Sequence, residues 1–225
     1  MLAMGTEMKT QRTTRGKRAM TLIELLVVIC ILVVAAALLL PALAAAKPKR
    51  SRINCVNNLK QITLSFKMWA GDNDDKYPMQ VSVTNGGAME SASRGITYLS
   101  FLVMSNELPT PKILICPNDT NRLAATNFTT DFNYQNISYF FGLDADDSYP
   151  QMILAGDDNL AVNGVRVRPG ILNLWTNAAV GWTKERHNGA GNIALADGSA
   201  AQTTALTFQS ALANTGFATN RFVIP

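Results

Sequence analysis

The feature that most constrains this chain is a block of apolar residues near its N-terminus. The stretch from Leu25 to Leu40 contains no charged residue, and the apolar character continues to Ala46. An α-helix rises about 1.5 Å per residue, so this block is long enough to approach a full crossing of a membrane. A cleaved secretory signal has a shorter apolar core that is followed by a small-residue cut site. The block therefore favours a retained membrane helix.

Charge is distributed unevenly around the apolar block. Residues 1–19 carry five basic groups and one acidic group, whereas residues 20–225 carry 15 of each sign. The net charge of +4 therefore belongs to the first 19 residues. Basic residues ahead of a membrane helix predict that the N-terminus is cytoplasmic and that the rest of the chain lies outside.

A short basic cluster follows the apolar block, at Lys47, Lys49, Arg50 and Arg52. It lacks the interleaved aromatic residues and the extent of a nucleic-acid-binding surface. We interpret the cluster as a turn that faces solvent or lipid headgroups, and we expect no nucleic-acid partner.

An acidic residue stands at the start of the apolar block. Glu24 is the one charged residue from Met20 to Ala46, and a carboxylate at the edge of a membrane helix is costly and usually functional. The surrounding sequence is Lys17-Arg18-Ala19-Met20-Thr21-Leu22-Ile23-Glu24-Leu25-Leu26-Val27-Val28. This segment resembles the cleavage and methylation site of type IV prepilins and type II secretion pseudopilins. Ala19 stands where the family usually has Gly, and Met20 where it usually has Phe.

The resemblance implies how the N-terminal segment is processed and used. A prepilin peptidase would remove residues 1–19 as a leader, cutting between Ala19 and Met20, and would methylate the new amine of Met20. In the family, the acid at the position of Glu24 pairs with the N-terminal amine of a neighbouring subunit, because an unpaired buried carboxylate is strongly penalised. Pro41 matches a helix-weakening proline that many members carry.

The apolar block leads into a second helical segment and a globular domain. We expect residues 20–46 to be the transmembrane and assembly helix, and residues 47–70 to be its amphipathic continuation. In the continuation, apolar residues recur at three- and four-residue steps and make one face that would dock on a sheet. They are Ile53, Val56, Leu59, Ile62, Phe66 and Trp69. A loop begins at Gly71, and residues 71–225 are the globular domain.

Patterning in the globular domain predicts a mixture of helices and short strands. Helices are expected over 95–104, with Ile96, Leu99, Leu102 and Val103 inward, and over 205–212. Strands are expected over 138–143, 151–155, 171–175 and 179–182, with loops over 118–136 and 157–170. Asp197-Gly198 suits a tight hairpin turn between 192–196 and 199–203. The predicted fold is α+β: a long N-terminal transmembrane and amphipathic helix packed on a small antiparallel β-sheet, pilin-like by resemblance.

A second resemblance involves the only histidine of the chain. Nine residues separate His187 from the pair Asp197-Gly198. This spacing is similar to the His-X9-Asp-Gly signature near the C-terminus of prepilin-type proteins from planctomycetes, verrucomicrobia and their relatives. Two further fragments agree with that group, Cys55-Val56-Asn57-Asn58-Leu59-Lys60-Gln61 and Cys116-Pro117-Asn118-Asp119. Its members are mostly described as type II secretion or pilin-like proteins.

The three cysteines leave one candidate disulfide. Cys30 lies inside the apolar block, so Cys55 and Cys116 are the pair available if the globular domain faces an oxidising compartment. Sequence alone does not place their Cα atoms within bonding range, so the paired and the free states both stay open.

The sequence indicates no complete catalytic or metal site. His187 could form a dyad with Asp197, but no nucleophile motif such as Gly-x-Ser-x-Gly is present. We favour a histidine that hydrogen-bonds to backbone near the hairpin. No cofactor motif is complete. Calcium is the one ion that the resemblance allows, because major pseudopilins hold it in a C-terminal loop. Its candidate ligands are Asp144, Asp146 and Asp147, or Asp72, Asp74 and Asp75 in another loop, and the alternative for both loops is an acid-rich turn that is only solvated.

Together these features predict a structural subunit without catalytic activity. We expect a subunit of a type II secretion pseudopilus or pilus-like filament, crossing the inner membrane once, with its globular domain periplasmic or extracellular. The expected partners are the prepilin peptidase, other pilin or pseudopilin subunits, the inner-membrane assembly platform and the membrane. One alternative is a type IV or minor pilin for adhesion or DNA uptake. Another is a membrane-tethered extracellular binding module or enzyme that uses a pilin leader for export.

Overall fold

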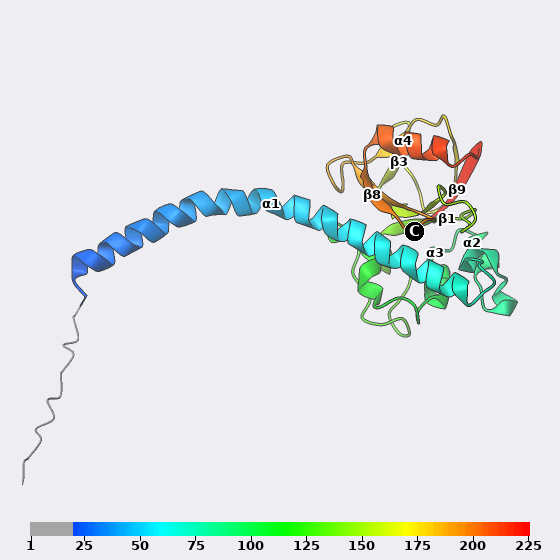
Figure 1. Cartoon of the computed structure of the whole chain (residues 1–225), viewed down its shortest axis with the longest axis horizontal. Helices are drawn as coiled ribbons and strands as arrows, with labels where there is room; N and C mark the ends of the chain where they lie inside the picture. Colours follow the sequence, from blue (N-terminus) through cyan, green and yellow to red (C-terminus); the bar gives the residue numbers. More distant parts are fainter. Residues whose placement is uncertain (1–19) are drawn as a thin grey trace, which may run out of the picture. The chain divides into compact units, whose positions relative to one another are not determined.

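The computed structural model describes residues 20–225, with all their side chains except those of 41–49. The chain divides into two units that meet between Ala46 and Lys47. The helix α1, Leu22–Gly71, contributes to both units, and Figure 1 shows it in blue to cyan. The expected leader, residues 1–19 with Ala19, lies outside the described residues.

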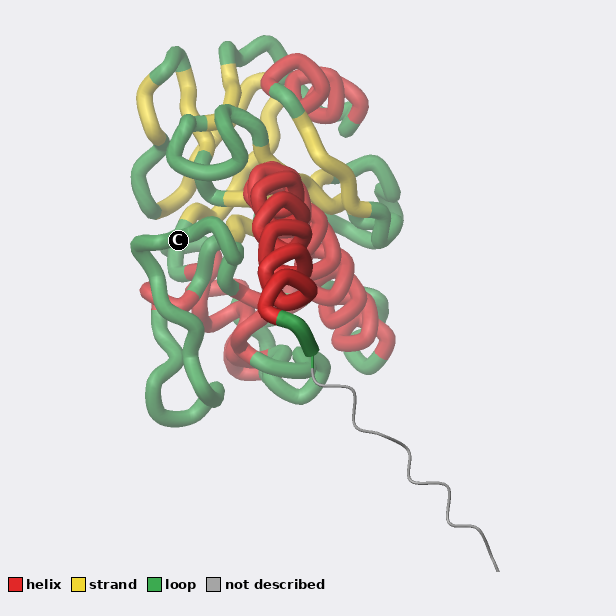
Figure 2. The backbone as a smooth tube through the Cα atoms, turned by 90° about the vertical axis from the view of Figure 1, so that its left-hand side faces the viewer, coloured by secondary structure: helices red, strands yellow, loops and turns green. Residues whose placement is uncertain are grey.

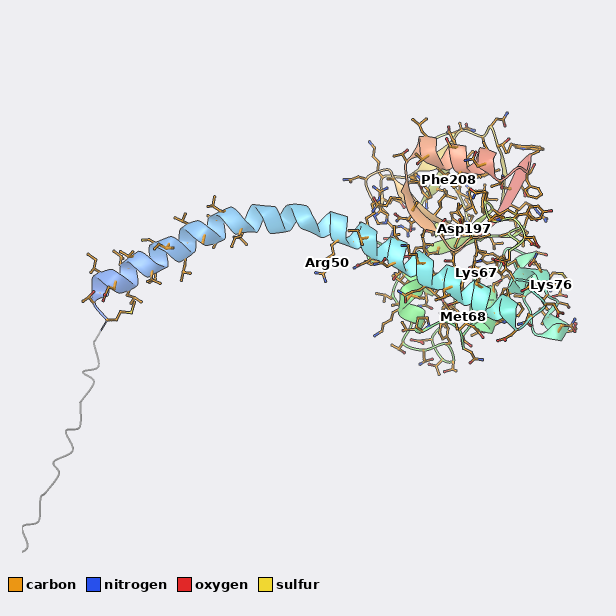
Figure 3. The ribbon with its side chains drawn as sticks, viewed as in Figure 1. Arg50, Lys67, Met68, Lys76, Asp197 and Phe208 are labelled. Atoms are coloured by element: carbon orange, nitrogen blue, oxygen red, sulfur yellow. The ribbon has the colours of Figure 1, made fainter. Side chains whose placement is uncertain are left out.

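The first unit contains the apolar half of α1. Within residues 20–225, Leu22–Leu40 is the one helical segment that is long and apolar enough to span a membrane. Its large side chains point away from the helix on all sides (Figure 3), and Leu22 is 84% exposed. Exposing this much apolar surface to water costs roughly 25 cal/mol per Å². The segment is therefore suited to a lipid or protein environment.

The second unit combines helices with short strands. Its helices, besides the later half of α1, are α2 (Met89–Ala92), α3 (Thr97–Val103) and α4 (Ala205–Asn214). Four single 3₁₀ turns lie at Pro78–Gln80, Val83–Asn85, Pro111–Leu114 and Tyr134–Asn136. The strands are β1 (Tyr139–Gly142), β2 (Ile153–Asp157), β3 (Leu160–Val162), β4 (Val165–Arg166), β5 (Gly170–Trp175), β6 (Val180–Trp182), β7 (Gly191–Leu195), β8 (Ala200–Thr203) and β9 (Thr219–Ile224).

The strands form two antiparallel sheets. The larger has six strands in the order β5-β9-β1-β2-β7-β8, and the smaller has three in the order β4-β3-β6. Figure 2 shows the strands gathered in one half of the second unit. The expected α+β class with an apolar N-terminal helix and an antiparallel sheet is confirmed.

Strands β1 and β2 of the larger sheet are buried on both faces, and adjacent residues of β1 pack in different cores. In β1, Tyr139 and Phe141 face a core that includes Leu59, Ile62, Phe66 and other residues of α1. Phe140 faces a second core with residues of the smaller sheet and of α4. In Figure 1 the strands lie between α4 and the later half of α1. This arrangement explains why β1 reads as a continuous apolar run, because neither of its faces meets water.

The buried face of α1 differs slightly from the predicted one. Leu59, Ile62, Phe66 and Trp69 are buried as expected, but Ile53 is 53% exposed. Cys55, four residues before Leu59, takes the next place on the buried stripe. Ile53 precedes Leu59 by six residues, so at 3.6 residues per turn it points away from the sheet.

Two strand regions differ from the sequence-based expectation. The expected loop at 157–170 instead contains β3 and β4, which pair as a hairpin around Asn163-Gly164. These two residues have φ of 51° and 78°, the left-handed conformation that Asn-Gly turns favour. The C-terminal strand β9 was also not predicted, and it lies between β5 and β1 in the larger sheet.

The inward face of α3 was predicted wrongly. The helix begins at Thr97, and its buried residues are Thr97, Ser100 and Phe101. The expected inward residues Ile96, Leu99, Leu102 and Val103 are only half-buried. Thr97 and Ser100 count as polar in a periodicity search, although they are small enough to be buried where a helix approaches its neighbours.

Candidate functional site

Four side chains that can bind metals or take part in redox chemistry meet in the interior of the second unit. Cys55, Cys116, Asp157 and His187 each offer one ligand atom, and these atoms lie within 4.8 Å of one another. Among residues 20–225 they are the one such group of His, Cys, Asp and Glu. They come from α1, the segment before β1, the end of β2 and the loop between β6 and β7. The fold therefore unites four distant parts of the sequence.

The two cysteines are the closest pair in this cluster. Their Sγ atoms lie 2.6 Å apart, and both residues are fully buried. Asn58, three residues after Cys55 on α1, donates from Nδ2 to the carbonyl of Ile115 at 3.2 Å. A tight turn follows Cys116, in which the amide of Asp119 donates to the Cys116 carbonyl at 2.8 Å. These bonds hold the cysteine-bearing segment against α1.

A strained loop presents His187 to the cysteines. His187, Asn188 and Gly189 have φ of 53°, 55° and 77°, a run of left-handed backbone that is uncommon for residues other than glycine. Asn159 holds the loop in this form, because its Nδ2 lies within 3.3–3.5 Å of the carbonyl oxygens of Thr183, Arg186 and Ala190. These three contacts close the loop around the amide of Asn159.

The ring of His187 contacts side chains. Its Nε2 lies 3.3 Å from Sγ of Cys116 and 3.5 Å from Oδ2 of Asp157, and its Nδ1 lies 3.3 Å from Nδ2 of Asn118. The expectation that His187 bonds to backbone near the hairpin is therefore wrong. Its signature partner Asp197 serves the hairpin turn instead, where its Oδ1 accepts from the amide of Ser199 at 2.7 Å.

Asp157 is a buried carboxylate with one well-satisfied oxygen. Its Oδ2 accepts from the backbone amide of Asn192 at 2.9 Å and from the Nδ2 of the same residue at 2.7 Å. Its Oδ1 is buried without a hydrogen-bond partner. Burial raises the pKa of Asp157 to about 7, and the negative charge of Cys116 adds to the effect.

The surroundings make the two thiols unequal when they are reduced. Contact with Cys55 is the largest cause that lowers the pKa of Cys116, and contact with His187 acts in the same direction. The same contact raises the pKa of Cys55. In the reduced protein Cys116 is therefore the more acidic of the two thiols.

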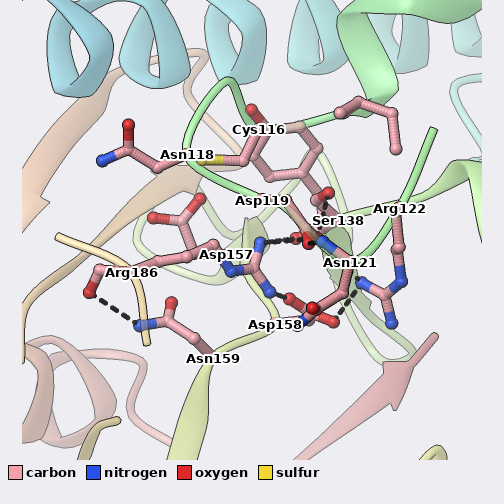
Figure 4. A network of polar contacts seen from close by, with 12 residues as sticks. Cys116, Asn118, Asp119, Asn121, Arg122, Ser138, Asp157, Asp158, Asn159 and Arg186 are labelled. Carbon is pink, nitrogen blue, oxygen red and sulfur yellow. Dashed lines mark hydrogen bonds and ion pairs between the residues drawn. The ribbon is translucent and has the colours of Figure 1, made fainter. Parts of the chain in front are cut away.

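A second polar network adjoins the cluster (Figure 4). Arg186 is buried and forms ion pairs with Asp158 and, at 3.4 Å, with Asp119. Arg122 also pairs with Asp158, and it donates to the carbonyl of Pro225 at 3.1 Å. Burial opposes the ionisation of Asp119, but Arg186 and a hydrogen bond from Ser138 outweigh it and lower its pKa. The network ties the C-terminus to the segment that carries Cys116.

The geometry of the cluster does not match a catalytic triad. In a triad the base binds the nucleophile with one ring nitrogen and the orienting acid with the other. Here Cys116 and Asp157 both face Nε2 of His187. The side chains of His187 and Asp157 are fully buried. The arrangement is suited to holding chain segments together.

A large cavity of the second unit lies beside the second network. It has a volume of about 1010 Å³, and its wall includes Tyr98, Arg122, Tyr134, Arg166 and Arg186. Its three arginines are balanced by Asp119, Asp131 and Glu185 in the same wall. The cavity is therefore not a strongly charged site.

The structure places the sequence-predicted residues in separate environments. At the start of α1, the backbone amide and the hydroxyl of Thr21 each donate to Oε2 of Glu24 at 2.8 Å. The helix runs through Pro41. Gly198 lies in the β7–β8 turn with φ of 91°, as expected, and a Cβ built on it would be 3.7 Å from Cε of Lys67. Figure 3 labels Lys67 on α1.

The candidate calcium ligands Asp144, Asp146 and Asp147 are each engaged by another residue. Asp144 pairs with Arg221, and Oδ2 of Asp146 accepts from Nε2 of Gln80 at 2.7 Å. Asp147 pairs with Nζ of Lys67 at 2.6 Å. Calcium binding at these residues stays a prediction.

Sequence reasoning did not identify Asp157 as part of the site. The signal available was the run Asp157-Asp158-Asn159 directly after a buried apolar strand, since three polar residues in such a place must find partners in the interior. Comparison of the chain with protein-family models, curated proteins and solved structures finds no match.

Proposed function

We propose that this chain is a structural subunit of a type II secretion pseudopilus or a pilus-like filament. The observation that carries the proposal is the segment Leu22–Leu40, an apolar helix with every described side chain exposed and one carboxylate, Glu24, at its start. A plain anchor needs the apolar length but gains nothing from the acid. A helix that leaves the bilayer to pack against copies of itself can use the acid to set its register.

Glu24 stands where it can serve both as a cap and as an assembly contact. Within one chain it accepts from Thr21 and so satisfies one backbone donor at the start of the helix. Cleavage after Ala19 would put a positively charged amine on Met20 of every subunit. Among packed apolar helices, that amine is the cation that relieves the cost of a neighbour's buried carboxylate. The resemblance to prepilins supplies this partner.

The second unit supports the proposal through the way α1 enters it. The buried stripe of α1 packs on the larger antiparallel sheet, which agrees with the pilin-like arrangement that the resemblance implies. We propose a pilin-like domain outside the membrane, because the basic residues of 1–19 precede the spanning segment. The expected partners are then the prepilin peptidase, other subunits and the inner-membrane assembly platform.

The proposal is tested by substituting Glu24 in the full chain. Glu24→Ala should leave leader removal intact and abolish recovery of the mature chain in sheared, sedimentable filaments. Asp72→Ala is the matched control, because it removes an exposed acid at the end of α1 without touching the apolar segment. Normal filaments from Glu24→Ala would contradict the assembly role.

One observation, the cavity in the second unit, favours the alternative of a membrane-tethered binding module. The cavity of about 1010 Å³ beside Arg122 and Arg186 is large enough for a small ligand. A wild-type chain that is exported but stays monomeric in the membrane would support this alternative against the filament.

A further inference from the structure

We propose that Cys55 and Cys116 form a disulfide that fastens α1 to the segment before β1, in a buried site lined by His187 and Asp157. The proposal goes beyond filament assembly and does not depend on it. It concerns a covalent modification of the second unit.

The spacing of the sulfur atoms is the first argument. A disulfide forms only where the fold brings two cysteine sulfurs together. A tetrahedral zinc ion with Zn–S bonds of about 2.3 Å would hold two sulfurs roughly 3.8 Å apart. The fold places the Sγ atoms of Cys55 and Cys116 in direct contact, at 2.6 Å, with no room for an ion between them.

The charge of the buried site is the second argument. The carboxylates of Asp119 and Asp158 are matched by the guanidinium groups of Arg122 and Arg186, which leaves His187 as the one basic side chain in contact with the two acids Asp157 and Cys116. A thiolate at Cys116 would leave one negative charge unmatched in the interior, which is costly. A disulfide carries no charge and removes this excess. Two thiolates around a zinc ion, together with Asp157, would again leave an excess negative charge.

The hydrogen bonds of Asp157 are the third argument. Its Oδ2, the oxygen nearest His187, already accepts two hydrogen bonds from Asn192. Those two bonds occupy both lone pairs of that oxygen. A metal ion bound through this oxygen would have to displace one of them, and only the unpartnered Oδ1 could bind a metal without that loss. A disulfide leaves both hydrogen bonds of the carboxylate in place.

The chemistry requires an oxidant of the protein-disulfide class, the kind that acts on exported chains. The Cys116 thiolate attacks the oxidant's disulfide, which forms a mixed disulfide and releases one thiolate. Cys55 then loses its proton and attacks the sulfur of Cys116, which closes the Cys55–Cys116 bond and releases the second thiolate. The two cysteines lose two electrons and two protons, and the oxidant becomes a dithiol. Because the pair is buried, this exchange precedes the closing of the domain over it.

Peptide mapping of the full chain tests the proposal. Protein from the membrane fraction is denatured in an alkylating reagent without reductant and digested with trypsin. Lysines and arginines separate the three cysteines into different peptides. We expect the peptides of Cys55 and Cys116 to appear linked, with a mass lower by two hydrogens than the sum of the two. Cys30 should be alkylated in the same sample.

Two variants and a metal measurement distinguish a disulfide from free thiols and from a metal site. Cys30→Ser should leave the linked peptides unchanged, and Cys116→Ser should abolish them and free Cys55 for alkylation. Recovery of Cys55 and Cys116 both alkylated from unreduced wild type would overturn the disulfide. If the undenatured protein then also carries one zinc ion per chain that is released on denaturation, the cluster is a metal site instead.

Discussion

Several ionisable side chains in the second unit are buried away from water. Asp157, Asp158 and Arg186 are buried, and each lies in contact with an opposite charge or a hydrogen-bond donor. Removing one member of such a group leaves its partner uncompensated, which typically costs more than the contact itself contributes. The interior between β1, β2 and the β6–β7 loop is thus sensitive to single polar substitutions.

The stability of the protein should depend on the ionisation of Asp157. Burial is the main cause that raises its pKa in the folded state, to about 7 beside a Cys116 thiolate and less far beside a disulfide, against about 3.9 in an unfolded chain. Between these values the folded state holds a proton that the unfolded state has lost. The free energy of unfolding contributed by this group therefore falls as pH rises from about 4 to about 7.

Asp157→Asn removes this dependence, because the amide does not ionise. We expect the wild type to lose more stability than the variant between pH 4.5 and pH 7.5. Urea unfolding in detergent, followed by tryptophan fluorescence, measures the difference, since all three tryptophans lie in the second unit. Parallel pH profiles for the two proteins would show that Asp157 ionises normally.

The proposed disulfide has an energetic consequence for the same unit. Cys116→Ser should lower the free energy of unfolding by about 2–5 kcal/mol, as loss of a native disulfide does in small exported domains. Cys30→Ser should have no effect on the same urea transition, because Cys30 lies outside the second unit. Equal stability of the two variants would contradict a structural cross-link.

At the scale of elements, α1 is one continuous helix whose two halves have different surroundings. Up to Leu40 its described side chains are exposed and apolar, whereas from Cys55 onward one stripe is buried against the sheet. The stripe follows three- and four-residue spacing because those positions share one face of a helix. The second half of α1 is thus part of the core.

Shortening one side chain in the buried stripe of α1 tests whether this half of the helix is part of the core. Phe66 is fully buried and packs edge-on against Tyr77 and Phe101, so Phe66→Ala should cost about 3–5 kcal/mol of unfolding free energy. Leu64→Ala is the matched control, because Leu64 is 57% exposed on the same helix and should cost far less. Similar urea midpoints for the two variants would mean that α1 is not packed on the sheet as described.

Local patterns predicted elements well where the signal was contained in adjacent residues. The apolar block, the later half of α1 and the hairpin at Asp197-Gly198 all depend on short-range periodicity or turn chemistry. β9 was not recognised, because its place between β5 and β1 is set by pairing with strands far away in sequence. The cysteine pair could be suspected from composition. Its meeting with His187 and Asp157 could not, since four separate segments must fold before these side chains approach.

At the scale of the whole molecule, processing should change the charge of the protein. The full chain has an isoelectric point of about 9.0, but residues 20–225 carry equal numbers of basic and acidic groups. The mature chain should therefore focus near neutral pH. Ala19→Phe, which places a bulky residue at the cut site, should keep the leader and focus near 9. A wild-type chain from membranes that also focuses near 9 would contradict leader removal.

The central claim is that this chain enters a filament through the prepilin pathway, and the mature N-terminus tests it most directly. Mass spectrometry of the intact chain and of its N-terminal peptide, from membrane fractions, should show a chain that begins at Met20 with a methylated amine. An intact Met1, or a chain cut near Ala46, would contradict the account. Either result would instead indicate a plain anchor or a released domain, with its function to be sought around His187 and the cavity beside Arg122.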